Sequence, residues 1–404
     1  MSVRKRFMGV AAVVTVAGVL AAPAVSAAPA VSAAPAVSAA PAASARPGAP
    51  GADHGHRATQ RALDRAVTAG VPGATGQAVD TYGTWNGTAG LGDLDARTPR
   101  GAYDHFRVGS ITKTFVAVVL LQLAAEGRLD LDDTVGEWLP GTVEGNGHDG
   151  DRITVRQLLN HTSGVYDYLA DPRFQRVYFT PEFMKHRFDT RPPEHWVRMA
   201  MSHRPRFRPG TAWGYSNTNY LLAGMIVERA TGHPYADEIR ARVIEPLGLR
   251  HTSLPGTRPT LPQPGSRAYS KLFADPLPRS TTYDVTELNP SEAGAAGEMI
   301  SSSADLNRFY RALLGGRLLP DEQLAQMKET VPAKDLGPGV GYGLGLMRVR
   351  LSCGTAVWGH GGGIQGSRSE AMATGDGRRA LAVNFNGDWT GDLKPVVEAE
   401  FCGE

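Results

Sequence analysis

Ser110 and Lys113 are the first pair of residues whose types and spacing could do chemistry. They precede an apolar run that ends at Gly127, a pattern that predicts a buried helix stopped at a glycine. Residues three apart share a helix face, so the Lys113 amine lies beside the Ser110 hydroxyl. The Ser110 N–H is one of the unpaired donors at the helix start, where partial positive charge can meet an oxyanion. The spacing therefore predicts a serine nucleophile with an adjacent amine.

Tyr215 and Asn217 form a second motif, directly before an apolar segment at 221–230 that is typical of a helix. A phenol has an ordinary pKa of about 10, so it carries protons near neutrality only beside a cation such as Lys113. The Asn217 amide can hold a substrate carbonyl or fix the lysine. A plainer interpretation is a buried tyrosine next to a helix cap. We expect Trp213, just before the motif, to line the cleft.

A glycine-rich segment after a strand-like run at 355–358 forms the third motif, His360-Gly361-Gly362-Gly363. Glycines let a substrate backbone approach a strand closely. Their N–H groups can complete an oxyanion hole with that of Ser110. The imidazole of His360 can add positive charge or a hydrogen-bond donor.

Each motif has competing interpretations. Ser-x-x-Lys is short, and Ser2 with Lys5 also fits it. A dinucleotide fingerprint matches at Gly361, Gly363 and Gly366, but the segment that follows is typical of a β-hairpin and not of a helix. His-Gly-Gly-Gly also occurs in lipases, yet this chain has no Gly-x-Ser-x-Gly nucleophile motif.

Composition fits a large globular enzyme. The 404 residues are 42% hydrophobic and 20% charged, which is enough for a sizeable core. The formal net charge is only +2, which argues against nucleic acid as a partner. We expect a monomer.

The N-terminal segment at 1–27 has the features of a secretory signal peptide. Three basic residues precede an apolar stretch at 7–20, and a small-x-small cleavage site follows. The apolar stretch is too short to span a membrane comfortably, so an anchor is the less favoured alternative. A repeat of period six rich in Ala and Pro covers residues 22–45, and we expect a disordered spacer over 28–55. The repeat leaves the cleavage site open between Ala27, Ala33 and Ala39.

Cys353 and Cys402 are the only cysteines of the chain. In an exported protein, an even pair predicts a disulfide, here one that ties the C-terminal segment to an earlier strand. Two free buried thiols are the alternative.

The folded part is expected from residue 56 to residue 404. The patterns predict a first helix at 57–69 and two short strands at 76–82 and 89–94. They also predict two short helical pieces at 129–135 and 153–161. A helical or irregular region is expected at 165–210, and a late hairpin at 369–386.

The three motifs, in this order, resemble the penicillin-recognising serine hydrolases, above all the secreted D-alanyl-D-alanine carboxypeptidases and class C β-lactamases. The likeness extends to further segments along most of residues 56–404. These include 106–130, 153–168, 215–233, 300–306 and 341–346. The resemblance implies an α+β fold of the β-lactamase/transpeptidase type: an antiparallel sheet flanked by helices, with a mainly helical lobe inserted at about 128–290.

The resemblance also implies a mechanism. Ser110 attacks a carbonyl, Tyr215 and Lys113 relay its proton, and His360 assists electrostatically. The N–H groups of Ser110 and Gly363 hold the oxyanion, and water then releases the acyl-enzyme; no metal or cofactor takes part. The expected protein is a secreted or wall-associated carboxypeptidase acting on peptidoglycan-type peptides that contain D-amino acids, and it also binds β-lactams.

One departure from the family pattern concerns the substrate's terminal carboxylate. Related carboxypeptidases grip it with hydroxyl residues after the histidine and with an arginine on the preceding strand. Here glycines stand at 361 and 363, and Met347 takes the arginine's place. Arg348 and Arg350 are neighbours of this position, and we expect that only one of them could readily substitute. We expect weakened carboxylate recognition, which leaves open an esterase, a D-aminopeptidase-like amidase, a β-lactamase or a catalytically weak wall-binding protein.

Overall fold

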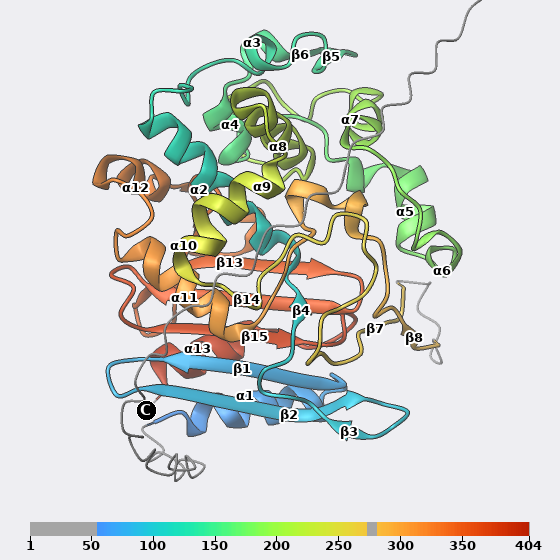
Figure 1. Ribbon diagram of the computed structural model, residues 1–404, viewed down its shortest axis with the longest axis vertical. Helices are drawn as coiled ribbons and strands as arrows, with labels where there is room; N and C mark the ends of the chain where they lie inside the picture. Colours follow the sequence, from blue (N-terminus) through green and yellow to red (C-terminus); the bar gives the residue numbers. More distant parts are fainter. Residues whose placement is uncertain (1–54, 273–280, 404) are drawn as a thin grey trace, which may run out of the picture. The chain divides into compact units, whose positions relative to one another are not determined.

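The structure, a computed structural model, describes residues 55–272 and 281–403 (Figure 1). The predicted signal peptide and all of the predicted spacer except Gly55 lie outside the described residues. Within the described ranges, no helix is both long enough and apolar enough to cross a membrane.

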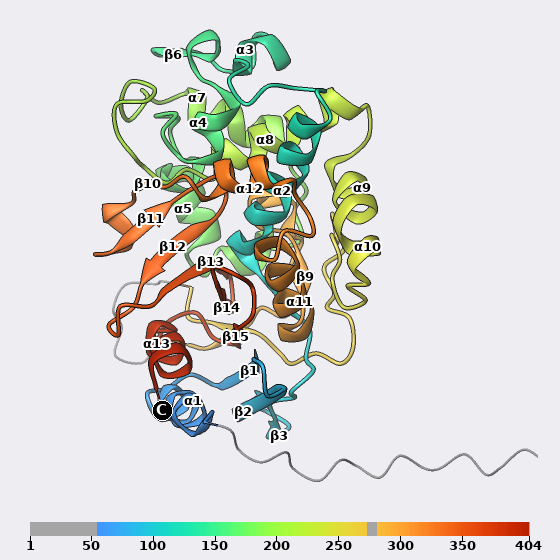
Figure 2. The ribbon, with the colours of Figure 1, turned by 90° about the vertical axis from the view of Figure 1, so that its left-hand side faces the viewer.

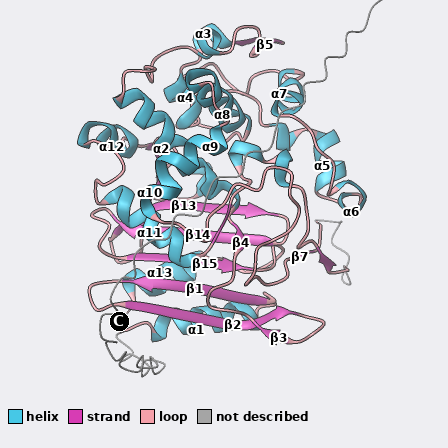
Figure 3. Cartoon of the chain, in the orientation of Figure 1, coloured by secondary structure: helices cyan, strands magenta, loops and turns pink. Residues whose placement is uncertain are grey.

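A nine-stranded antiparallel sheet forms the centre of the described fold (Figure 3). Its strands lie in the order β10-β11-β12-β13-β14-β15-β1-β2-β3. Their bounds are β1 Gly73–Val79, β2 Thr84–Asp93, β3 Thr98–Pro99, β10 Val331–Pro332, β11 Val340–Tyr342, β12 Met347–Arg350, β13 Ala356–Ile364, β14 Ser367–Thr374 and β15 Ala380–Phe385. Because β1 pairs with β15, with Ala74 opposite Phe385, the two ends of the folded chain share one sheet.

Helices cover both faces of this sheet (Figure 2). On one face lie α1 (Arg57–Thr68) and α13 (Lys394–Cys402), and on the other lies α11 (Ser303–Leu314). All six side chains of β15 are buried, and most are apolar, as expected for a strand covered on both sides. The late hairpin is confirmed as β14 and β15, and the first helix as α1.

A mainly helical lobe lies between β4 (Phe106–Arg107) and β9 (Ile300–Ser301), which pair with each other. Its helices are α2 Thr112–Ala125, α3 Val135–Trp138, α4 Val155–Leu159, α5 Pro172–Tyr178, α6 Phe183–His186, α7 Pro193–Met201, α8 Thr218–Thr231, α9 Tyr235–Ile239 and α10 Glu245–Leu247. The lobe also holds two small strand pairs, β5 (Glu144–Gly145) with β6 (His148–Asp149), and β7 (Tyr269–Ser270) with β8 (Tyr283–Asp284). The predicted fold class is thus confirmed.

Two helices of this lobe, α2 and α8, pack against each other and hold the first two motifs at their starts. Both are apolar around most of their circumference, so most of their side chains are buried. They provide a rigid base for residues that must keep fixed distances.

Two local predictions need correction. The segment at 129–135 was expected to be helical, but helix begins only at Val135, where Thr134 and Glu137 form a capping box. Ser110 was expected on the first turn of the long helix, but it lies in a separate 3-10 turn, Gly109–Ile111, immediately before α2.

Cys353 and Cys402 form a disulfide, with their Cα atoms 5.6 Å apart. It joins the turn after β12 to the last residue of α13. The C-terminal helix is therefore fastened to the sheet, as the cysteine pair predicts.

Candidate active site

The turn that carries Ser110 is held tightly against β13. A Cβ added at Gly362 would lie 1.9 Å from the Val108 carbonyl oxygen and 2.9 Å from the Ser110 amide nitrogen. Gly109 has φ 54°, and a Cβ there would lie 2.6 Å from the Gly363 amide nitrogen. Only glycine fits such contacts, so the glycines at 109 and 362 allow strand and serine turn to meet.

This contact places Ser110 and Gly363 on neighbouring stretches of backbone, and both residues line the same cavity. A Cβ added at Gly363 would meet nothing within 4 Å, so this residue borders open space. β12 pairs with β13 as far as Gly359, and no described strand pairs with that edge at 361–364. The two amides can therefore serve a carbonyl oxygen that enters from the cleft.

Lys113 is fully buried, and its Nζ has three hydrogen-bond partners. These are Ser110 Oγ at 2.9 Å, Asn217 Oδ1 at 2.8 Å and the Ala296 carbonyl oxygen at 2.7 Å. Burial lowers the pKa of Lys113 to about 7, although Asp167 opposes this shift. A neutral amine can accept the Ser110 proton and still donate to Asn217 and Ala296, so Lys113 is suited to be the base.

Asp167 holds the Asn217 amide in place. The Asn217 backbone N–H and Nδ2 both donate to the Asp167 carboxylate, at 3.1 Å each. This contact leaves Asn217 Oδ1 directed at Lys113. Burial raises the pKa of Asp167, while these hydrogen bonds and Lys113 act in the opposite direction. Asp167 was not among the predicted site residues.

The Tyr215 side chain lies beside both the nucleophile and the lysine. Its ring centroid is 5.0 Å from Lys113 Nζ. Burial raises the pKa of Tyr215, and a hydrogen bond with the Ser110 side chain opposes that shift only in part. Tyr215 is thus a phenol that can pass a proton, whereas the expectation that a nearby cation makes it a base does not fit this environment.

His360 is buried and neutral. Burial lowers its pKa to about 3, and Lys113 acts in the same direction. Its Nδ1 lies against the Gly361 carbonyl oxygen, which fixes that nitrogen as the N–H donor. Nε2 then accepts from the Tyr342 hydroxyl at 2.8 Å. The positive charge considered for His360 is therefore corrected: its burial favours the uncharged imidazole.

A second histidine supports the tyrosine. The His161 ring centroid lies 4.3 Å from that of Tyr215 and 4.8 Å from that of Tyr342. Its Nδ1 accepts from the Ser216 N–H at 3.2 Å and faces Asn219 Nδ2 at 3.1 Å. Burial lowers the pKa of His161 well below its usual value. No spacing signal connects these positions, because they come together only through folding.

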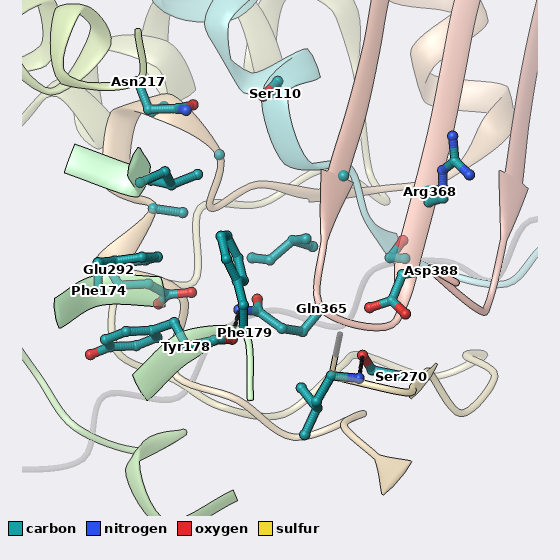
Figure 4. A pocket seen from close by; sticks show the side chains of 18 of the residues that line it. Ser110, Phe174, Tyr178, Phe179, Asn217, Ser270, Glu292, Gln365, Arg368 and Asp388 are labelled. Carbon is teal, nitrogen blue, oxygen red and sulfur yellow. Dashed lines mark hydrogen bonds between the residues drawn. The ribbon is translucent and has the colours of Figure 1, made fainter. Parts of the chain in front are cut away.

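A cavity of about 520 Å³ opens beside Ser110 (Figure 4). Ser110, Asn217 and Gly363 lie in its wall, together with a group of aromatic and aliphatic side chains. These apolar side chains are Leu169, Phe174, Tyr178, Phe179, Leu272, Ile364 and Trp389. Such a wall suits a hydrophobic side chain on the acyl residue.

Trp213 is not part of this wall. Its ring lies 5.9 Å from that of Tyr342 and 6.1 Å from that of His161, and it borders a separate hollow. The structure therefore places Trp213 beside the catalytic group rather than in the cavity at Ser110.

Glu370 occupies the space beside Gly361. The two residues are opposite each other on β14 and β13, and a Cβ added at Gly361 would lie 2.6 Å from Glu370 Oε2. Burial raises the pKa of Glu370 to about 7, with Asp392 acting in the same direction. The position that carries a hydroxyl in related carboxypeptidases therefore borders an acidic side chain.

Neither Arg348 nor Arg350 provides, in the cavity wall, the carboxylate-binding arginine whose place Met347 takes. The Arg348 guanidinium lies 5.8 Å from the Trp358 ring centroid, and Arg350 is exposed. Neither residue lines the cavity at Ser110. Among the described residues, no group of three His, Cys, Asp or Glu side chains could hold a metal ion.

Residues 33–396 match the β-lactamase family, and the chain therefore belongs to this family of serine hydrolases. Among solved structures, it is similar to a D-stereospecific amidohydrolase from Streptomyces sp., with 58% identity, a TM-score of 0.82, and coverage of 86% of this chain and 99% of that one. It also resembles the D-amino acid amidase from Ochrobactrum anthropi SV3 in complex with L-phenylalanine amide, with 31% identity, a TM-score of 0.72, and coverage of 85% and 97%.

A D-aminopeptidase from Cereibacter sphaeroides (strain KD131 / KCTC 12085) is 28% identical over 80% of this chain. This chain spans 60% of the length of that relative. The predicted resemblance is thus confirmed for family and fold.

Proposed function

We propose that this protein hydrolyses amides and esters of D-amino acids through an acyl-enzyme on Ser110. The observation that carries the proposal is the acid beside Gly361. A free carboxylate on the leaving group would approach Glu370 where carboxypeptidases offer a hydroxyl, and above the Glu370 pKa of about 7 the two like charges repel. An amide nitrogen or an alcohol oxygen meets no such repulsion.

The similar solved structures support this proposal over the expected carboxypeptidase. One is described as a D-stereospecific amidohydrolase and the other as a D-amino acid amidase. We also propose that the protein is secreted, because the segment at 1–27 has the sequence features of a signal peptide.

Acylation begins with neutral Lys113. Its lone pair accepts the Ser110 proton as Oγ bonds to the substrate carbonyl carbon. The carbonyl oxygen becomes an oxyanion between the amides of Ser110 and Gly363. The Tyr215 hydroxyl, hydrogen-bonded to Ser110, then passes its proton to the leaving nitrogen or oxygen, and the bond to the leaving group breaks. Tyr215 takes the proton held by Lys113 in return, so the phenol is restored and the amine is neutral again before water enters.

Deacylation repeats these steps with water. The same base takes a proton from water as its oxygen attacks the ester carbon, and the Ser110–acyl bond breaks. The proton returns to Ser110 Oγ, and the D-amino acid departs. Asn217, fixed by Asp167, keeps Lys113 directed at the serine throughout.

Two matched substrate pairs test the proposal. We expect D-phenylalanine amide to be hydrolysed and L-phenylalanine amide not, and Ser110→Ala to abolish the reaction. We also expect a peptide ending in amidated D-alanyl-D-alanine to be cleaved faster than the same peptide with a free carboxylate. Preference for the free carboxylate, or equal rates for D- and L-amides, would contradict the proposal.

A further inference from the structure

Glu292 is a buried acid that the reaction at Ser110 does not use. It lies in the wall of the same cavity, and its side chain is only 5% exposed. Oε2 is buried and has no hydrogen-bond partner. An unpaired carboxylate oxygen is costly in a protein interior, so this atom calls for a ligand.

A buried basic residue, Arg107, lowers the pKa of Glu292 but forms its hydrogen bonds elsewhere. Its Nη2 donates to the carbonyl oxygens of Pro259 at 2.6 Å and Leu288 at 3.0 Å, and its buried Nε and Nη1 have no hydrogen-bond partner. Burial still raises the pKa of Glu292 to about 7. Arg107 therefore does not satisfy this carboxylate, and a further cation would favour its ionised form.

Aromatic rings surround the carboxylate (Figure 4). Phe174 and Tyr178 are stacked with centroids 4.4 Å apart, and Phe179 meets Phe174 edge-on at 5.6 Å. Figure 4 shows the Glu292 carboxylate among these three rings, directed into the cavity. Ring faces and a carboxylate together attract an organic cation, and a neutral group would leave the acid unpaired.

The opposite wall does not supply the missing cation. Asp388 is a second acid in the lining, and it accepts the Gly366 N–H at 2.8 Å. Arg368 also lines the cavity, but its Nη1 donates to the Gly391 carbonyl oxygen at 2.6 Å. The described lining thus carries two acids, Glu292 and Asp388, and its one arginine, Arg368, is hydrogen-bonded to the backbone rather than to either acid.

We propose that Glu292, with Phe174, Tyr178 and Phe179, forms a subsite for the cationic side chain of a basic D-amino acid such as D-lysine or D-ornithine. This inference rests on the proposed function. The α-amino group of the acyl residue is only two bonds from the carbonyl that Ser110 attacks, whereas Figure 4 places the Glu292 carboxylate across the cavity from Ser110. A side chain, not the α-amino group, therefore reaches it.

The test compares D-lysine p-nitroanilide with D-norleucine p-nitroanilide, which has the same carbon chain without the ammonium group. We expect the wild-type protein to favour D-lysine by about 10-fold in kcat/KM, mainly through KM. Glu292→Gln should lower kcat/KM for D-lysine by about 10-fold to 100-fold and leave D-norleucine nearly unchanged. Glu287→Gln, on the same segment but exposed, should change neither value.

Two further measurements guard against a variant that folds poorly. Glu292→Asp keeps the charge and should retain part of the preference for D-lysine. In the wild-type protein, n-butylamine should inhibit D-norleucine hydrolysis more strongly than n-butanol. Hydrolysis of D-norleucine without preference for D-lysine, or a preference that survives Glu292→Gln, would overturn the subsite alone. If neither anilide is cleaved, the proposed function fails and the subsite with it.

Discussion

Lys113 determines the chemistry at the residue scale. Three hydrogen-bond partners and complete burial hold its amine beside the Ser110 hydroxyl, and burial lowers its pKa to about 7. The amine is therefore largely protonated below that pH and largely neutral above it. Only the neutral form can accept the serine proton.

The first prediction concerns the pH dependence of Ser110 reactivity. Sulfonylation by phenylmethanesulfonyl fluoride, which has no titrating group, should speed up as pH rises through about 7 and then level off. Lys113→Met should slow it by about 100-fold and remove the pH dependence near 7. A rate that keeps rising toward the ordinary pKa of tyrosine, about 10, would instead assign the base to Tyr215.

The second prediction concerns Glu370. Replacing it with glutamine removes the charge beside Gly361, so cleavage of a free-carboxylate D-alanyl-D-alanine peptide should rise by about 10-fold relative to its amide. The ratio of kcat/KM for the two peptides measures this. Glu322→Gln, an exposed acid on α12 (Asp321–Lys328), should leave the ratio unchanged. If Glu370→Gln leaves the ratio of kcat/KM values unchanged, the main support for an amidase is lost.

Sequence patterns predicted the residues that share a local motif but not those brought together by folding. Ser110 and Lys113 are three positions apart, so helix geometry already relates them, and Asn217 follows Tyr215 by two within one short motif. Asp167 and Tyr342 come from separate segments with no such spacing. The uncharged state of His360 also escaped prediction, because burial depends on packing around the whole site.

At the scale of elements, the contact between β13 and the serine turn decides whether the oxyanion site exists. Gly109 combines φ 54° with a close approach to the Gly363 amide. Gly127, at the end of α2, has φ 66° but would meet nothing within 4 Å if a Cβ were added. A substitution at Gly127 therefore adds backbone strain alone, whereas one at Gly109 adds the same strain and also disturbs the contact with β13.

The third prediction uses this pair. Gly127→Ala should lose about 1–2 kcal/mol of unfolding free energy, because an L-residue is strained at positive φ. Gly109→Ala should lose more, because its Cβ also clashes with the Gly363 backbone. Only Gly109→Ala should also displace β13 and lower kcat, by about 100-fold. Denaturant unfolding and steady-state rates measure both effects. Equal activities in the two variants would show that the contact does not shape the site.

Elements with strong periodicity were predictable, and irregular ones were not. The apolar runs of α2 and α8 and the hairpin of β14 and β15 follow from sequence pattern alone. The segment at 129–135 did not form the expected helix, because the capping box at Thr134 starts the helix later. That signal was present in the sequence as Thr134-Val-Gly-Glu137.

For the whole molecule, the first and last helices of the described chain stabilise the sheet together. Glu400 on α13 accepts from Thr59 Oγ1 at 2.8 Å, and His56 Nδ1 lies 2.9 Å from it. The Cys353–Cys402 disulfide, which links residues 49 apart, fastens this helix a second time. These contacts lie away from the residues that line the Ser110 cavity.

The fourth prediction follows from that separation. Replacing both cysteines with serine should lower the unfolding free energy by about 4 kcal/mol on the chain-entropy account of a loop of this length. Activity of the folded protein at ambient temperature should stay within about two-fold of wild type, because the site keeps its own contacts. A large loss of activity without a loss of stability would show that α13 positions the site.

The central claim is that Ser110 forms an acyl-enzyme with D-amino acid substrates. Intact mass after rapid acid quenching with D-phenylalanine methyl ester tests it most directly. We expect a mass increase of one phenylalanyl group on the wild-type protein, absent with the L-ester and absent in Ser110→Ala. Hydrolysis of the D-ester by Ser110→Ala at the wild-type rate, or an adduct formed equally from the L-ester, would contradict it.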